Sequence, residues 1–207
     1  MKYIHELPSV REGLDHLVVK DPFFKKSKID IQNFVWPYMG PGLPGLVRIV
    51  IGQQVSTAAA ATMWARFQEK VPQVTPQAIL KLTPEDMKAL GLSRQKSAYI
   101  SGLAQAVAAK TFDFDKLTQL EDDAISEAIT AVKGLGPWSA QMYLMFALGR
   151  PDVWPAGDLG IQEGLRIYLG RDERPGVMET LLEGKRFAPH RTAASLLLWH
   201  TKAGSKN

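Results

Sequence analysis

Apolar residues recur at helical spacing along nearly the whole chain, and the alternation typical of a half-buried β-strand is hard to find. The longer patterns predict helices over residues 10–20, 45–70 (interrupted at 52–56), 94–110, 122–133, 138–148, 158–169 and 189–202. Shorter helices are expected after residues 75 and 83 and from about residue 175. About ten helices and no strand predict an all-α protein.

Turn-forming residues mark several of the predicted helix ends. Ser56 follows the break in the 45–70 pattern and is a predicted N-cap for the helix after it. Two further N-caps are each followed by proline at the first helical position, namely Thr75-Pro76 and Thr83-Pro84. The first helix is predicted to stop at Asp21-Pro22. Residues 34–44, rich in proline and glycine, are predicted to form an irregular connector.

A short segment with two glycines joins two of these helical patterns. It reads Lys133-Gly134-Leu135-Gly136-Pro137-Trp138. Glycines permit positive φ and let another backbone approach closely, and the free N–H groups at the start of the next helix can hold a phosphate. A plain αα-turn with Gly134 as the C-cap explains the same residues. Pro137 fits both interpretations.

A carboxylate follows 20 residues after Trp138. Asp158 is placed to cap the helix predicted from that position, as Asp often does. A helix N-terminus also favours an ionised carboxylate, which could stabilise a cation developing on a sugar. One placement therefore serves either role.

Aromatic and amide residues have both structural and functional interpretations. Trp138 and Trp199 lie on apolar helices and by default would be core residues, as would Trp36. Gln53 and Gln54 stand together in the predicted loop after a buried helix, where unpaired amides are costly. They could cap the broken helix or enter the gap left by an extruded nucleotide.

Composition narrows the class of site. The 207 residues carry a formal net charge of +4, a weak indication of a polyanionic partner. No cysteine is present, which excludes disulfides, thiol nucleophiles and cysteine-held metal clusters. The four histidines are scattered, so a protein metal cage is not expected. With no apolar run of membrane-spanning length and no leader-like start, we expect an intracellular protein that does not enter a membrane.

Taken together, these segments resemble the helix-hairpin-helix DNA glycosylases, specifically the 3-methyladenine DNA glycosylase II family. The similarity covers most of the chain from about residue 40 onward. Five stretches carry it in the family's order: Leu46 to Ser56 (LVRIVIGQQVS), Gly91 to Lys96 (GLSRQK), Gly134 to Ala140 (GLGPWSA), Pro151 to Asp158 (PDVWPAGD), and Arg191 to Ser195 (RTAAS) leading into Leu198-Trp199.

The resemblance implies a two-lobed helical domain with a DNA-binding cleft between the lobes, the central lobe covering about residues 55–150. It also implies an enzyme that flips a damaged base out of duplex DNA. By position, Asp158 matches the catalytic aspartate, and Gln54 matches the residue that plugs the base stack. The implied base pocket comprises Trp138, Trp199, Met142 and Tyr143. The implied DNA contacts comprise Gln53, Gln54, Lys133, Gly134, Leu135, Gly136, Ser139, Arg94, Lys96 and Arg191.

Two departures from the family pattern concern the plug and the pocket. Some members carry a leucine plug where this chain has Gln54, so intercalation here is expected to be more polar. Some members show a pocket tyrosine where this chain has Met142, with Tyr143 next to it. No cofactor is expected to be required. Family members often hold a monovalent cation, Na⁺ or K⁺, through hairpin carbonyls, here those of Lys133 and Leu135.

The chemistry of alkylated purines suits these residues. Methylation at N3 or N7 puts positive charge on the base and weakens its bond to the sugar, so no dedicated general acid is needed. Asp158 can then stabilise the oxocarbenium-like sugar and orient water. Relatives that also nick the strand carry a lysine where Trp138 stands, and tryptophan cannot form their Schiff base.

The sequence therefore predicts a monofunctional glycosylase of base-excision repair, acting as a monomer on damaged double-stranded DNA in the cytoplasm or nucleoid, or in the nucleus of a eukaryote. Two alternatives stay open. One is a non-catalytic helix-hairpin-helix DNA-binding protein, which would need neither Asp158 nor the tryptophan pair. The other is a glycosylase for deaminated bases or ethenoadenine.

Overall fold

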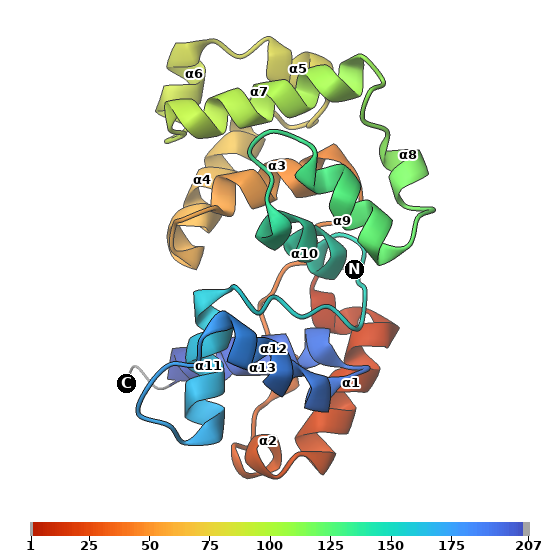
Figure 1. Ribbon diagram of the computed structural model, residues 1–207. Helices are drawn as coiled ribbons and strands as arrows, with labels where there is room; N and C mark the ends of the chain where they lie inside the picture. The colour runs from red at the N-terminus through yellow and green to blue at the C-terminus, as the bar shows by residue number, and fades with distance from the viewer. Residues whose placement is uncertain (1, 205–207) are drawn as a thin grey trace. The chain divides into compact units, whose positions relative to one another are not determined.

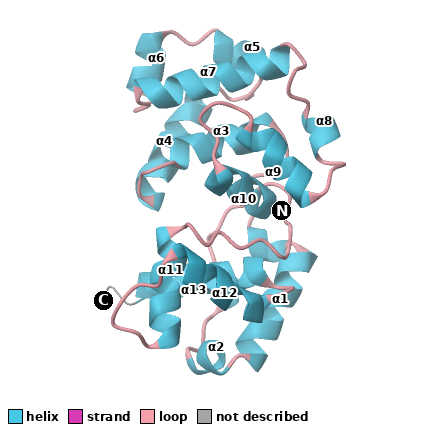
Figure 2. Cartoon of the chain, viewed as in Figure 1, coloured by secondary structure: helices cyan, strands magenta, loops and turns pink. Residues whose placement is uncertain are grey.

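The computed structural model describes residues 2–204, and within this range helices joined by loops make up the fold. No β-ladder forms among these residues; the single isolated bridge joins Tyr3 to Pro37 (Figures 1 and 2). The predicted all-α fold is therefore confirmed. No helix in this part of the chain is both long and apolar enough to cross a bilayer.

The chain divides into two compact units. The central unit covers residues 39–143, and the terminal unit combines the residues up to Tyr38 with those from Leu144 onward. The central unit begins ahead of the expected residue 55, because the helix of residues 43–52 contacts the helices that follow it. Its end at Tyr143 falls within the helix of residues 137–146.

The central unit is built around an apolar helix, α3 (Leu43–Gly52), which contacts α4 and α7. Leu46, Val50 and Ile51 of α3 are fully buried. The short helices α5 and α6 lie against α7 (Figure 1). The other helices of this unit are α4 (Thr57–Lys70), α5 (Pro76–Leu80), α6 (Pro84–Ala89), α7 (Arg94–Ala108), α8 (Phe114–Leu117), α9 (Asp122–Thr130) and the start of α10 (Pro137–Phe146).

The terminal unit brings the two ends of the chain together. Helix α13 contacts both α1 and α11, and α11 approaches it so closely that a Cβ on Gly164 would lie 2.4 Å from the backbone oxygen of Leu198. Glycine is therefore required for this helix contact. The helices of this unit are α1 (Pro8–Lys20), α2 (Pro22–Lys26), α11 (Leu159–Leu169), α12 (Val177–Gly184) and α13 (Arg191–Gly204). Three 3-10 turns accompany them: η1 (Ile4–Glu6), η2 (Ile31–Asn33) and η3 (Lys185–Phe187).

The predicted caps are confirmed. The side chains of Ser56, Thr75 and Thr83 each accept a hydrogen bond from a first-turn N–H. Asp21-Pro22, expected only to stop α1, also starts α2, because the Asp21 carboxylate accepts hydrogen bonds from the next two free N–H groups. Helices α2 and α8 were not expected, since four or five residues are too few to show an apolar period.

The cap at Thr83 generates a pH-dependent prediction. Asp86 completes a capping box with Thr83, and its carboxylate lies 2.8 Å from Lys70 Nζ. The hydrogen bonds from Lys70 and Thr83 lower the pKa of Asp86 from 3.8 to about 2. A lowered pKa in the folded state gives stability that is present above the unfolded-state value and is lost as the pH falls through about 2.

We therefore expect Asp86→Asn to lower the urea unfolding midpoint at pH 7, and the gap to wild type to close as the pH falls from 4 towards 2. Urea unfolding followed by circular dichroism at several pH values measures this. Glu85→Gln, which removes a neighbouring carboxylate of the same helix, is the control. A gap that stays constant with pH would contradict the role given to the Asp86 charge.

Candidate DNA-binding and catalytic site

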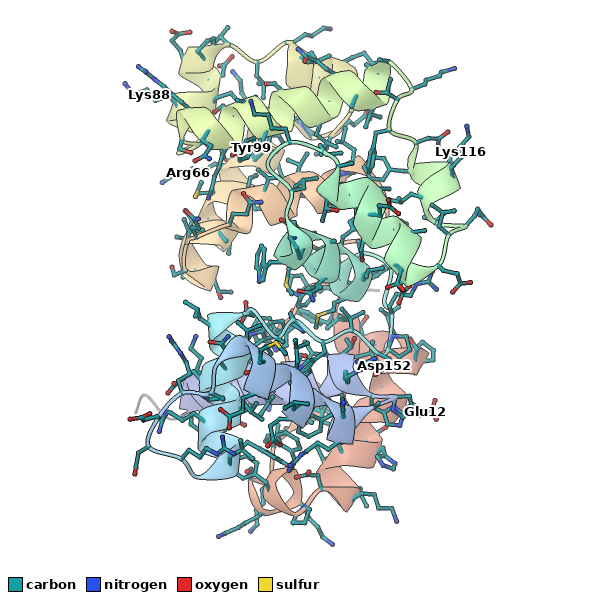
Figure 3. The ribbon with its side chains drawn as sticks, viewed as in Figure 1. Glu12, Arg66, Lys88, Tyr99, Lys116 and Asp152 are labelled. Atoms are coloured by element: carbon teal, nitrogen blue, oxygen red, sulfur yellow. The ribbon has the colours of Figure 1, made fainter. Side chains whose placement is uncertain are left out.

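The hairpin after α9 depends on glycine at one position for folding. Gly134 has φ +92°, and a Cβ there would lie 2.2 Å from Cγ of the Tyr99 ring. Tyr99 reaches the hairpin from α7 (Figure 3). Gly136 differs: a Cβ there would meet no heavy atom of the described residues within 4 Å, and its φ is not positive. The fold therefore requires glycine at position 134, but neither packing nor backbone conformation requires it at position 136.

The two glutamines after α3 have different roles. Gln53 Nε2 donates to the backbone oxygen of Gly134 at 2.9 Å and to Ser139 Oγ at 3.0 Å, so this amide ties the α3–α4 loop to the hairpin. Ser139 is buried at 2% exposure, and its position is fixed by this bond. Gln54 is exposed and has φ +54°, a left-handed conformation that is uncommon for a residue with a Cβ. The structure thus holds Gln53 inward and presents Gln54 on the surface.

The four predicted basic DNA contacts fall into two groups. Lys133 and Arg94 have exposed side chains. Lys96 Nζ donates to the backbone oxygen of Ile51 at 2.7 Å, near the C-terminus of α3, and desolvation lowers the pKa of Lys96. Such a cation favours the negative end of a helix dipole. This hydrogen bond gives Lys96 a structural role that does not need a contact with DNA.

Arg191 also has a strong partner within the protein. Its guanidinium donates to both carboxylate oxygens of Asp152, at 2.7 Å and 2.8 Å. These hydrogen bonds raise the pKa of Arg191. Because Asp152 balances the charge locally, the paired geometry explains Arg191 without a phosphate. Its DNA contact stays a prediction.

The carboxylate of Asp158 is held by three N–H donors. Asp158 caps α11, and its Oδ1 accepts hydrogen bonds from Gly160 N at 2.7 Å and Ile161 N at 3.0 Å. The indole Nε1 of Trp199 donates to the same oxygen at 2.9 Å. The expected cap is confirmed, and charge-assisted bonds of this kind fix both the position and the plane of a carboxylate. The side chain is half-buried and so retains access to solvent.

The loop before Asp158 is anchored along its length. Thr192 Oγ1 donates to the backbone oxygen of Arg150 at 2.7 Å and accepts from Val153 N at 3.1 Å. Trp154 Nε1 donates to the backbone oxygen of Thr180 at 2.8 Å, and the Trp154 side chain is buried. Asp158 N then closes a turn onto the backbone oxygen of Pro155 at 2.9 Å. The carboxylate is thus carried by a loop whose backbone is bonded to α12 and α13.

Trp199 was expected to be a pocket wall, and the structure gives it a further role that the sequence did not indicate. Its indole donates to Asp158, and it lies over Gly160, where a Cβ would come within 2.8 Å of the indole ring. Gly160 is therefore small because the tryptophan that holds the carboxylate must pass over it. The only sequence signal was a glycine in the first turn of α11.

The other predicted pocket residues lie on α10. Trp138 is half-buried, and its contact with a base stays a prediction. Tyr143 is fully buried, and its hydroxyl oxygen accepts a hydrogen bond from Gly42 N at 2.8 Å. A base can stack only on an accessible ring face, so this core position does not support the predicted pocket role of Tyr143. Met142, at 5% exposure, belongs to the same buried stretch.

No group of three metal-ligating side chains of the His, Cys, Asp and Glu type occurs in the part of the chain that the structure describes. The hairpin offers a different donor set, backbone carbonyl oxygens. The oxygen of Gly134 is engaged by Gln53, and the oxygen of Gly136 accepts from Ala140 N at 3.1 Å. The predicted cation site at the carbonyls of Lys133 and Leu135 stays a prediction.

Comparisons with known proteins identify several similar proteins. DNA-3-methyladenine glycosylase 1 of Schizosaccharomyces pombe is 33% identical over 162 residues, which cover 75% of this chain and 70% of that protein. A putative DNA-3-methyladenine glycosylase of Bacillus subtilis, YfjP, is 28% identical over 75% of this chain, which spans only 57% of that relative. The solved structure of the S. pombe 3-methyladenine DNA glycosylase Mag1 with abasic DNA superposes with a TM-score of 0.81 at 29% identity, covering 93% of this chain and 97% of that one.

The family model described as "HhH-GPD superfamily base excision DNA repair protein" matches residues 47–189, a range that includes the Gln53 loop, the hairpin and Asp158. The chain belongs to the HhH-GPD superfamily of base excision DNA repair proteins.

Proposed function

We propose that this protein is a monofunctional DNA N-glycosylase that releases alkylated purines, of the 3-methyladenine and 7-methylguanine type, from duplex DNA. The observation that carries the proposal is the Asp158 carboxylate, fixed by three N–H donors at the start of α11. The names of the S. pombe and B. subtilis relatives support 3-methyladenine as a substrate.

The reaction uses Asp158 as an electrostatic partner for the sugar. The bond between C1′ and the base nitrogen breaks, and its electron pair leaves with the cationic base, which departs neutral. The sugar then carries oxocarbenium character, which the fixed carboxylate stabilises. Water adds its oxygen to C1′, and its released proton passes to Asp158 and on to solvent. Since the carboxylate is already oriented by Gly160, Ile161 and Trp199, no reorganisation is needed as the charge develops.

Binding to DNA is assigned to the hairpin and to the exposed residues near it. Gly136 lets a phosphate approach the amides at the start of α10, and exposed Lys133 and Arg94 add sequence-independent attraction. Gln54, exposed on its strained backbone, fills the space left by the everted nucleotide. The enzyme acts as a monomer on genomic DNA.

A monovalent cation is part of this proposal. The backbone oxygens of Lys133 and Leu135 would hold Na⁺ or K⁺, since uncharged oxygen donors suit hard cations and the neighbouring hairpin oxygens already have N–H partners. Bound there, the ion would add positive charge at the phosphate. The chemistry at C1′ does not pass through it.

Asp158→Asn tests the chemical step. The amide keeps an oxygen for the cap but loses the negative charge, so we expect base release to fall by about 100-fold or more. Mass spectrometry of the bases released from methylated duplex DNA measures this, with binding to the same DNA as the second readout. Glu163→Gln, which neutralises a carboxylate of the same helix, is the control.

Two outcomes would contradict the proposal. If Asp158→Asn released bases at the wild-type rate, Asp158 would have no part in the mechanism. If the wild-type protein bound DNA but released no base, a non-catalytic binding protein would be favoured.

Gly136→Ala tests the phosphate contact. Since the added methyl group has open space in the protein, we expect an unchanged melting temperature but about tenfold weaker binding to duplex DNA, because the methyl group stands where the phosphate approaches. Gly102→Ala is the matched control, a second glycine of the central unit with open space around it. Fluorescence anisotropy with labelled duplex measures both. Equal affinities for Gly136→Ala and wild type would remove the hairpin from the DNA interface.

The side chain at position 138 generates a prediction about strand cleavage. A tryptophan cannot form a Schiff base, so we expect borohydride to trap no covalent protein–DNA complex during the reaction. Heating parallel samples, incubated without borohydride, in alkali should break the strand at the abasic sites, which shows that bases were released. A borohydride-trapped complex with pure protein would contradict the monofunctional assignment.

A further inference from the structure

The positive charge of this protein is concentrated in one short segment. Residues 20–28 carry a net charge of +3, whereas the whole chain carries +4. The segment spans the last residue of α1, all of α2 and the two residues after it (Figure 1). Its positive charge comes from four residues, which together form the lysine patch: Lys20, Lys25, Lys26 and Lys28. The charge that indicates a polyanionic partner therefore lies mainly outside the hairpin and the region of Asp158.

The charges of the lysine patch face solvent. All four side chains are exposed. Among the residues that the structure describes, none of the four forms an ion pair. Four neighbouring cations with no carboxylate partner repel one another, and a bound polyanion would relieve this repulsion.

The helix that carries the patch is anchored to the rest of the terminal unit. Asp21 Oδ1 accepts from the N–H groups of Phe23 and Phe24 at 3.0 Å and 3.2 Å, and Asp21 Oδ2 accepts from the Tyr168 hydroxyl at 2.8 Å. Phe24 is fully buried, with its ring centroid 5.4 Å from that of Tyr168 on α11 and 6.3 Å from that of Phe187 on η3. The lysines are therefore held at a defined place beside α11.

Within the terminal unit this place is distant from the carboxylate of Asp158. Asp158 caps the N-terminus of α11, whereas Tyr168, which anchors the patch, lies in the last turn of the same helix. At about 1.5 Å per residue, these two positions are about 15 Å apart along the helix axis. Charges more than about 8 Å apart are largely screened at physiological ionic strength. The lysines therefore act on phosphates close to them and contribute little to the potential at Asp158.

The chemistry of the patch favours the backbone of DNA over an acidic protein. A lysine presents a point charge that suits a phosphate, and phosphate contacts carry no sequence information. Duplex DNA presents one negative charge per about 1.7 Å of its axis, so that several neighbouring lysines can bind it at once. Lysine is instead depleted from protein–protein interfaces, whose centres are apolar. The apolar Phe24 of α2 is already buried inside the unit.

We propose that the lysine patch binds the backbone of a second segment of duplex DNA, while the site at Asp158 holds the segment under repair. The inference rests on the DNA binding in the proposed function and does not depend on base release. Since the two contacts lie near opposite ends of α11, the enzyme can hold one segment and sample another. The second contact is independent of sequence.

The test asks whether protein that already holds one duplex captures another. Beads carry a duplex with a tetrahydrofuran abasic analogue, protein is bound to them, and unbound protein is washed away. A labelled undamaged duplex is then added at several salt concentrations, and the amount captured per protein is measured. One variant combines Lys25→Gln, Lys26→Gln and Lys28→Gln. The matched control removes three exposed lysines of the central unit, through Lys81→Gln, Lys110→Gln and Lys116→Gln.

We expect wild-type protein and the central-unit control to capture the labelled duplex, and the patch variant to bind it about tenfold more weakly. Each phosphate contact contributes about 0.9 to the slope of log affinity against log salt, so loss of three contacts should flatten this slope by about 2.7. Affinity for the abasic duplex should stay within about twofold of wild type. Because the substituted side chains are exposed, melting temperatures should not change.

Four results would overturn the inference. Equal capture by the patch variant and wild type would show that the lysines do not bind DNA, and an equal loss in the central-unit control would show that only net charge matters. A parallel loss of affinity for the abasic duplex would place the lysines on the first segment. Capture of a labelled poly-glutamate peptide in place of duplex would assign the patch to an acidic protein.

The failure of the proposed function has a different signature. If wild-type protein did not bind the first duplex, the proposed function and the inference would both be refuted. If it bound the first duplex and captured no second one, only the inference would be refuted. Base release is not part of the measurement, so a protein that binds DNA without releasing bases would still test the patch.

Discussion

Three N–H groups converge on one oxygen of Asp158, and the contact between α11 and α13 makes this possible. Two of them belong to the free first turn of α11, and the third is the indole of Trp199 on α13. Because α11 and α13 approach closely through Gly160 and Gly164, the indole reaches the carboxylate across the helix contact. The charge at the site is therefore fixed by the packing of two helices.

The central unit has a corresponding arrangement at the hairpin. Gln53 bonds to Gly134 and Ser139, so the loop after α3 and the turn before α10 hold each other. Gly134 accepts Tyr99 against its backbone, while Gly136 faces open space. Glycine is thus needed for folding at position 134 and not at position 136. The two adjacent glutamines also differ: Gln53 is hydrogen-bonded within the protein, and Gln54 is exposed.

Local features were predictable because their causes are local. Apolar spacing predicts helices α4, α7 and α13. The caps follow from residue types whose side chains bond to N–H groups within three positions, as at Ser56, Thr75 and Thr83. Helix α2 was missed because its cap, Asp21, had been taken as the end of α1. The cap at Asp158 and the glycine turn at Gly134 were predictable because their neighbours in sequence form the motif.

Contacts between distant residues could not be predicted from the order of residues. The sequence determined that the chain is helical, that a glycine hairpin precedes α10 and that an aspartate caps α11. Only the tertiary structure decided that Trp199 bonds to that aspartate, that Trp36 lies beside Trp199, that Tyr143 is core, and that Arg191 is paired with Asp152. The reason is physical: helix formation depends on neighbours within one or two turns, whereas these contacts join residues that are close only after helices have packed.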